Sequence, residues 1–252
     1  MKVRHAVVAF ALGTPTSIAL AQGDTITLGR GNAFVDGSVY VPHLARVKQS
    51  ISRNGQEGQS FSFTNDLTLA TRDGRPVIRI ESRAQPGSPD PTWHLETVMD
   101  RRTTELLFRE ARSARQQVTF AVDAGHVHGQ AKIDRDTAAQ AIDFQLDVPA
   151  FLDAVMDGTL GAIHFRQGLV VRIPTFGAAP AARTPKWREF TVTGRDTVAV
   201  GTRRVPAWVV EERGTPRSRI WFIDEPPYVP LWLTYLPDGA IARLEQELMP
   251  KP

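Results

Sequence analysis

Residues 60–70 read SFSFTNDLTLA, and the alternation in this stretch decides the fold class. Phe61 and Phe63, followed by two leucines, fall on one face of an extended chain, and hydroxyl-bearing and acidic residues fall on the other. Successive residues of a strand point to opposite faces of its sheet. The stretch therefore predicts a strand that buries one side and exposes the other to water.

The same pattern continues on both sides of this stretch. Residues 46–53 alternate around Val47 and Ile51 and lead into Asn54-Gly55, a dipeptide that favours hairpin turns. A helix with Leu44, Val47 and Ile51 on one stripe is the alternative for this segment. Asp73-Gly74 separates residues 60–70 from a further strand. Other strands are expected at 77–83, 93–99, 106–108, 118–122, 127–133, 142–146, 169–173, 188–192, 197–200, 205–211, 218–223, 231–236 and 241–248.

One helix is expected to interrupt the strands. Asp147 offers a cap, and Leu152, Val155 and Met156 have helical spacing before a stop at Gly158. Early strands are polar on one face, whereas several late strands are apolar on both. This pattern predicts a mainly β protein, in which a strongly curved antiparallel sheet forms a half-barrel with one main helix and covering loops.

The amino-terminal residues have the pattern of an export signal. Lys2 and Arg4 precede the apolar run at residues 6–12, and Ala19-Leu20-Ala21 predicts cleavage before Gln22. A buried first helix or an inner-membrane anchor is the alternative, although an anchor needs about 20 continuous apolar residues. We expect residues 1–21 to be a signal peptide and residues 22–252 to form a single half-barrel domain. The expected location is periplasmic or secreted.

The amino-acid composition excludes sites that need cysteine and gives no reason to expect nucleic acid as a partner. The 252 residues include no cysteine, so disulfides, thiolate nucleophiles and cysteine-ligated metals are excluded. The formal net charge is only +3, which gives no electrostatic reason to expect nucleic acid as a partner. No motif in the sequence calls for a cofactor, and we expect none.

Two pairs of polar residues that include histidine are the clearest candidates for a polar site. His126 and His128 share one strand face, so both imidazoles could bind one cation with Asp143 from a neighbouring strand. Lys132 continues that face and argues against a cation, so these histidines are weak metal candidates. His94 and Glu96 share a face in the same way and could act as an acid–base pair. A solvent-facing polar side is the favoured interpretation of both pairs.

Two stretches carry a family resemblance. Residues 96–107 read ETVMDRRTTELL, and the later segments WVVE (208–211) and RIWFID (219–224) precede an LPDG turn at 236–239. Together they resemble exported bacterial proteins of unknown function over residues 60–248. The resemblance implies a fold similar to the outer-membrane lipoprotein carrier family, an incomplete curved barrel with an apolar concave face and a helical lid. It brings no catalytic residues with it.

The expected function follows from an apolar concave face on an exported sheet. Such a face favours binding of a hydrophobic small molecule or acyl chain, with a peripheral contact to the outer membrane or an envelope protein. A metal- or acid/base-dependent hydrolase and a non-catalytic protein-interaction module remain alternatives. The side chains expected to line the site, including two on the helix, are Phe61, Phe63, Leu95, Phe120, Phe144, Leu152 and Met156.

Overall fold

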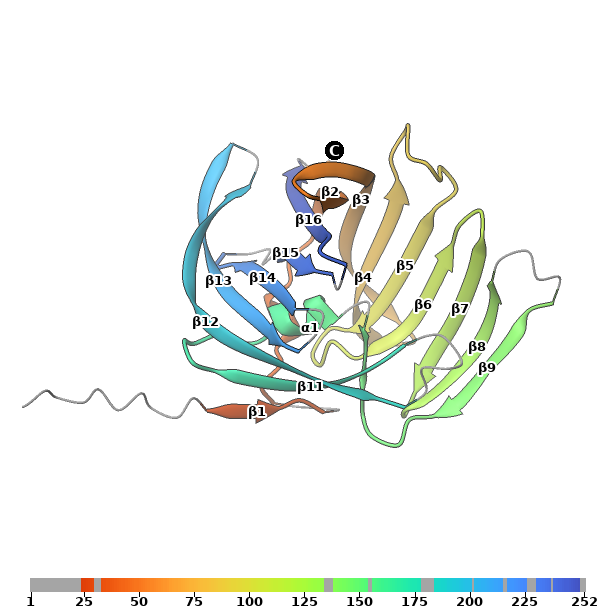
Figure 1. Ribbon diagram of the computed structural model, residues 1–252. Coiled ribbons are helices and arrows are strands. Elements are labelled where there is room, and N and C mark those ends of the chain that lie inside the picture. The colour runs from red at the N-terminus through yellow and green to blue at the C-terminus, as the bar shows by residue number, and fades with distance from the viewer. Residues whose placement is uncertain are drawn as a thin grey trace, which may run out of the picture.

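One curved sheet surrounds a short helix in the computed structural model (Figure 1). The structure describes residues 24–29, 33–133, 138–153, 156–177, 184–200, 202–214, 217–225, 230–236 and 238–249, and only the backbone of residues 232 and 233. The expected signal peptide, residues 1–21, lies outside the described residues and stays a prediction.

Sixteen strands form the sheet. The short elements are the 3-10 helix η1 (Gly37–Val39) and the α-helix α1 (Met156–Gly161). The strands are β1 (Thr25–Thr27), β2 (His43–Arg53), β3 (Gln56–Arg72), β4 (Arg75–Ala84), β5 (His94–Asp100), β6 (Leu106–Arg112), β7 (Gln116–Asp123), β8 (His126–Ile133), β9 (Gln140–Gln145), β10 (Phe151–Leu152), β11 (Val170–Phe176), β12 (Lys186–Val200), β13 (Arg203–Arg213), β14 (Arg217–Ile223), β15 (Pro230–Tyr235) and β16 (Ile241–Met249).

The sheet is mainly antiparallel and does not close. Its order is β1-β11-β12-β13-β14-β15-β16-β2-β3-β4-β5-β6-β7-β8-β9, and β10 pairs with β11 beside this path. Among the described strands, only β1 and β10 run parallel to their neighbour β11. No described strand joins β1 to β9, so the predicted half-barrel is confirmed.

The antiparallel β16·β2 ladder joins two arms. The first arm, β2–β9, and the second arm, β11–β16, curve toward each other, and α1 lies between them (Figure 1). We call the face toward α1 the concave face and the opposite face the convex face.

Local turn chemistry explains the hairpins of the first arm. Asn54 and Gly55 have φ angles of 52° and 77°, and Asp73 and Gly74 have 51° and 76°. These positive angles are those of the tight hairpin turns expected from the two dipeptides. Residues 43–53 form β2, so the strand interpretation of this segment is confirmed and the helical alternative is wrong.

The helix lies further along the chain than predicted. Leu152, expected in the helix, belongs to β10, which pairs with Thr175–Phe176 of β11. Gly158, the expected stop, lies inside α1. Both residues of β10 are buried, and their packing in the core overrides the helical spacing. Val155 lies outside the described residues.

Two strands are longer than their sequence patterns predict. β3 has 17 residues and β12 has 15, and β12 joins segments predicted as two strands, 188–192 and 197–200. A bulge between Val192 and Gly194 shifts the register within β12. The extra residue at a bulge bends the strand without ending it, so the interruption in the pattern marks a bend.

Candidate functional site

The concave face and α1 line a half-open cavity of about 500 Å³. Strands of both arms contribute to its wall, and α1 lies between them (Figure 1). Apolar and polar side chains share this wall. The apolar ones are Phe63, Ile80, Trp93, Leu95, Met99, Met156, Ile220 and Leu244.

Three aromatic side chains cluster in the first arm. The ring centroids of Phe61 and Phe63 are 5.5 Å apart, and Trp93 lies 5.0 Å from Phe61 and 4.9 Å from Phe63. The ring planes of Phe61 and Trp93 meet at 83°, an edge-to-face arrangement that stabilises aromatic pairs beyond their burial. The cluster therefore gives the cavity a rigid apolar wall.

Three of the seven side chains expected to line a ligand site do line the cavity: Phe63, Leu95 and Met156. Phe61 belongs to the aromatic cluster and contacts Phe63 and Trp93. The other three are buried in the hydrophobic core outside the described cavity wall: Phe120, Phe144 and Leu152. The alternation of a strand predicts which face of the sheet a side chain lies on. It does not predict whether that side chain lines the cavity or packs in the core, because this depends on the curvature of the sheet.

A salt-bridge cluster lies on the wall beside α1. Arg188 on β12 donates from Nε and Nη2 to the two carboxylate oxygens of Glu212 on β13, at 2.6 and 2.7 Å. Its Nη1 donates to Asp153 at 2.5 Å. The Arg188 and Glu212 side chains are 23% and 10% exposed. Burial opposes the charge of Arg188, but these two carboxylates outweigh it and raise the pKa of Arg188.

Asp157 on α1 also faces this cluster. Burial raises the pKa of Asp157 to about 6. The positive charge of Arg188 opposes this rise, whereas the nearby carboxylates add to it. Sequence reasoning did not identify this cluster, because its members come from separate strands and α1, whose register the alternation does not specify.

Arg109 is a second cation on the wall, in the first arm. It lies on β6, in register with Thr97 of β5 and Phe120 of β7. Its Nη1 donates to Thr97 Oγ1 at 3.1 Å. Burial lowers the pKa of Arg109 to about 10, which leaves it protonated at neutral pH. Among the described residues, no carboxylate forms an ion pair with it. Sequence reasoning missed Arg109 as well.

Other polar groups on the wall are paired with each other. The Ser82 hydroxyl donates to Asn65 Oδ1 at 2.6 Å, and the hydroxyls of Ser218 and Thr234 lie 3.0 Å apart. Gln246 Nε2 donates to a backbone carbonyl of β15 at 2.7 Å. Because these groups have partners, an apolar ligand could lie over them without leaving them unsatisfied.

Hydrogen bonds and close packing hold α1 in place. The buried Tyr40 hydroxyl donates to the Gly158 carbonyl, and Thr104 Oγ1 donates to Thr159 Oγ1 at 3.1 Å. Burial raises the pKa of Tyr40, so this hydroxyl keeps its proton. A Cβ added to Gly161 would lie 2.6 Å from Tyr40 Oη. Only glycine therefore fits at this contact.

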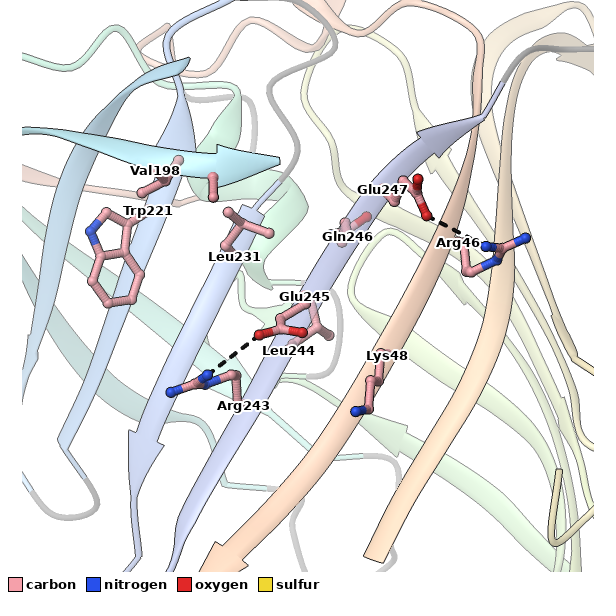
Figure 2. A pocket seen from close by; sticks show the side chains of 11 residues that line it. Arg46, Lys48, Val198, Trp221, Leu231, Arg243, Leu244, Glu245, Gln246 and Glu247 are labelled. Carbon is pink, nitrogen blue, oxygen red and sulfur yellow. Dashed lines mark hydrogen bonds and ion pairs between the residues drawn. The ribbon is translucent and has the colours of Figure 1, made fainter. Parts of the chain in front are cut away.

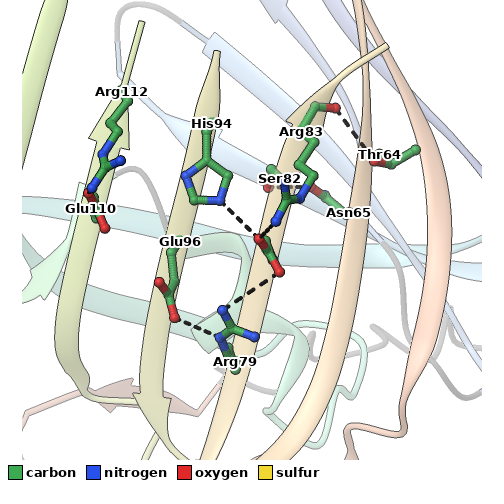
Figure 3. A network of polar contacts seen from close by, with 10 residues as sticks. Thr64, Asn65, Arg79, Ser82, Arg83, His94, Glu96, Glu110 and Arg112 are labelled. Atoms are coloured by element: carbon green, nitrogen blue, oxygen red, sulfur yellow. Dashed lines mark hydrogen bonds and ion pairs between the residues drawn. The ribbon is translucent and has the colours of Figure 1, made fainter. Parts of the chain in front are cut away.

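His94 and Glu96 share the convex face but do not pair with each other (Figure 3). His94 Nε2 lies 3.0 Å from Glu81, and Arg79 Nε donates to Glu96 at 2.6 Å. Burial raises the pKa of Glu81, but hydrogen bonds from His94 and Arg83 outweigh it and lower that pKa. His94 and Glu96 thus belong to a network of alternating charges on the polar face, and the alternative of an acid–base pair between them is not formed.

His126 and His128 lie at the β8–β9 end of the sheet. Their rings stack with centroids 5.3 Å apart, and His126 Nε2 lies 2.7 Å from Asp143 Oδ1. His128 stands opposite Asp143 in the ladder. Within the described part of the chain, no group of three or more His, Cys, Asp or Glu side chains has an arrangement that could hold a metal ion.

A second hollow, of about 630 Å³, reaches the charged side of β2 and β16. Arg243 pairs with Glu245 there, and Arg46 pairs with Glu247 (Figure 2). All four side chains are more than half exposed. Lys48 pairs with Glu57. Water screens such exposed pairs, so their charges would bind a ligand only weakly. We therefore take the cavity between the concave face and α1 as the candidate site.

Comparisons with known proteins give a family match. A family model described as a protein of unknown function (DUF3108) matches residues 57–246, from β3 into β16. No curated protein matches the chain. The chain is similar to a solved structure of a DUF1329 family protein from Desulfovibrio piger, with 9% identity and a TM-score of 0.32 over 83% of this chain and 85% of that one. No described helix has the length and apolarity that a membrane crossing requires.

Proposed function

Since the chain belongs to the DUF3108 family of proteins of unknown function, we propose its function from the geometry of the cavity. The protein binds a hydrophobic molecule with an acyl-like chain between the concave face and α1. The volume of about 500 Å³ lies within the range of ~300–1,000 Å³ that is usual for small-molecule sites.

The apolar wall is the observation that carries this proposal. Its eight apolar side chains come from both arms and α1, so a bound chain would contact all parts of the fold that meet here. Burial of apolar surface contributes about 25 cal/mol per Å², from which the cost of ordering the ligand is subtracted. Met99 and Met156 adapt their shape more easily than branched side chains, which suits ligands of unequal length.

The proposed export of the chain indicates a role for this binding. We propose that residues 1–21 direct secretion and that the mature chain carries its ligand through an aqueous compartment, toward the outer membrane or an envelope protein. The sequence resemblance to exported bacterial proteins of unknown function, which implies a fold similar to the outer-membrane lipoprotein carriers, supports this role. Amino-terminal sequencing of protein from a periplasmic fraction should begin at Gln22. A chain that keeps Met1 in the cytoplasm would contradict the proposed route.

Native mass spectrometry of the freshly purified protein tests the binding proposal. We expect an added mass that organic extraction releases as lipid. Leu95→Trp places a large ring in the cavity, whereas Ser60→Trp places the same ring at an exposed position of β3. The first variant should lose the added mass and bind palmitic acid at least about tenfold more weakly, a difference of ~1.4 kcal/mol. The second should behave like the unchanged protein.

Circular dichroism would verify that both variants fold. The proposal fails if the unchanged protein carries no lipid and binds neither palmitic acid nor cetyl alcohol, the alcohol with the same chain. It also fails if the two tryptophan variants bind equally well, because the ligand would then lie outside the cavity.

A further inference from the structure

We propose that Arg109 binds the headgroup of the ligand and that this headgroup is a carboxylate. This inference rests on the proposed function and names the class of ligand: a long-chain carboxylic acid. It starts from the distribution of charge over the cavity wall, where four charged side chains are present: Arg109, Asp153, Asp157 and Arg188.

The carboxylates of the wall all lie with Arg188. Glu212 and Asp153 bind its guanidinium directly. The charges that act on Asp157 belong to this same cluster and do not include Arg109. Arg188 is therefore neutralised within the fold. An anionic ligand group would meet a concentration of negative charge at this end of the cavity.

Arg109 has the opposite environment. Among the described residues, its side chain donates only to the neutral hydroxyl of Thr97, which cannot balance a positive charge. Its neighbour on β7, Phe120, is 1% exposed and supplies only apolar surface. Arg109 is half-buried on the cavity wall, and a partly desolvated cation without a counter-ion costs the fold free energy. Retaining a guanidinium here is explained if an anion completes the site.

The geometry of the guanidinium selects the anion. Its planar fork matches a carboxylate through two parallel hydrogen bonds. One guanidinium balances one negative charge, so a monoanion fits better than a headgroup with several charges. The apolar residues Ile80, Leu95 and Met156 share the cavity with Arg109 and would contact the tail. The head would lie at Arg109, away from the acidic cluster.

Palmitic acid and cetyl alcohol separate this inference from the proposed function. Both have the same chain length, and only the acid carries a charge. We expect the unchanged protein to bind the acid at least about tenfold more tightly than the alcohol at neutral pH, since charge-assisted hydrogen bonds are the stronger ones. Titration calorimetry or native mass spectrometry would give both dissociation constants.

Arg109→Met should remove this preference. The variant should bind the acid at least about tenfold more weakly than the unchanged protein and bind the alcohol equally well. Arg79→Met, which removes an arginine from the convex face, should change neither affinity. Equal affinities for acid and alcohol in the unchanged protein would overturn the inference while leaving hydrophobic binding intact. Binding of neither compound would overturn both, and this comparison needs no variant to fold.

Discussion

The two faces of the first arm treat arginine in different ways. On the convex face, Arg79, Arg83 and Arg112 each lie beside a glutamate. On the concave face of the same arm, Thr97 is the one hydrogen-bond acceptor that the described residues offer Arg109. The convex arginines are 41–68% exposed, so water solvates their charges whether or not the partner is present. The half-buried concave cation is solvated less, so its energetic effect depends more on the group placed next to it.

The second arm shows the alternative way to hold a cation on the concave face. Arg188 lies between Glu212 and Asp153 and is neutralised within the fold. The comparison thus predicts large effects where a concave ion pair is broken and small ones where a convex pair is broken. Three measurements of the free energy of unfolding test this expected difference between the two faces.

Breaking the concave pair should have the largest effect. Glu212→Ala removes two hydrogen bonds from Arg188, a side chain only 23% exposed. Removing one partner of a buried pair costs about 3–5 kcal/mol, and because Asp153 still pairs with Arg188 in this variant, we expect a loss near the lower end of this range. Urea denaturation at neutral pH should show a loss of this size. A loss below about 1 kcal/mol would mean that concave and convex pairs are equivalent.

Protonation of Asp157 should have an intermediate effect. Its pKa is raised from 3.8 to about 6 in the folded protein, so the folded state favours the protonated form. The stability it contributes is complete below about pH 4 and is lost as the pH rises through 6. At ~1.4 kcal/mol per pKa unit, the loss is at most about 3 kcal/mol.

Asp157→Asn keeps the size of the side chain and removes its titration. The stability of this variant relative to the unchanged protein should therefore rise between pH 4 and pH 7, as measured by urea denaturation at both values. A difference that stays constant across this window would mean that burial does not raise the pKa of this carboxyl, and one that falls would mean that Arg188 outweighs burial and lowers that pKa.

Breaking a convex pair should have the smallest effect. Glu96→Gln removes one of the two glutamates beside Arg79, whose side chain is 41% exposed and which keeps Glu81 at 3.6 Å. Exposed pairs contribute about 0–1 kcal/mol and weaken with salt. The variant should lose less than about 1 kcal/mol, and added sodium chloride should reduce the loss further. A salt-independent loss of several kcal/mol would show that the network in Figure 3 behaves as a buried one.

The sequence predicted the faces of the strands better than the site between them. Alternation placed Phe61 and Phe63 on one face, and two turn dipeptides set the hairpins. Both features depend on neighbouring residues alone. The pairing of Arg188 with Glu212 depends on the register of β12 with β13, and a bulge shifts that register. A period-two pattern does not show where a bulge will be accommodated.

The helix demonstrates the same limit. Leu152 has helical spacing with Met156, but it pairs with β11 together with Phe151 in a parallel ladder. Similarly, Phe120 and Leu95 have equivalent patterns, and only Leu95 reaches the cavity. Which apolar side chain is core and which is wall depends on the curvature of the entire sheet. That curvature is a property of all the strands together.

The meeting of β2 with β16 has a consequence for how the molecule forms. This ladder brings together Arg46 and Glu247, which are 201 positions apart in the chain. Contacts between such distant residues form slowly, since a long loop must close before they contribute. β2 of the first arm can pair with β16 only after β16 has been synthesised. Assembly of the seam, and with it the enclosure of any cargo, is therefore a late event in the life of the nascent polypeptide.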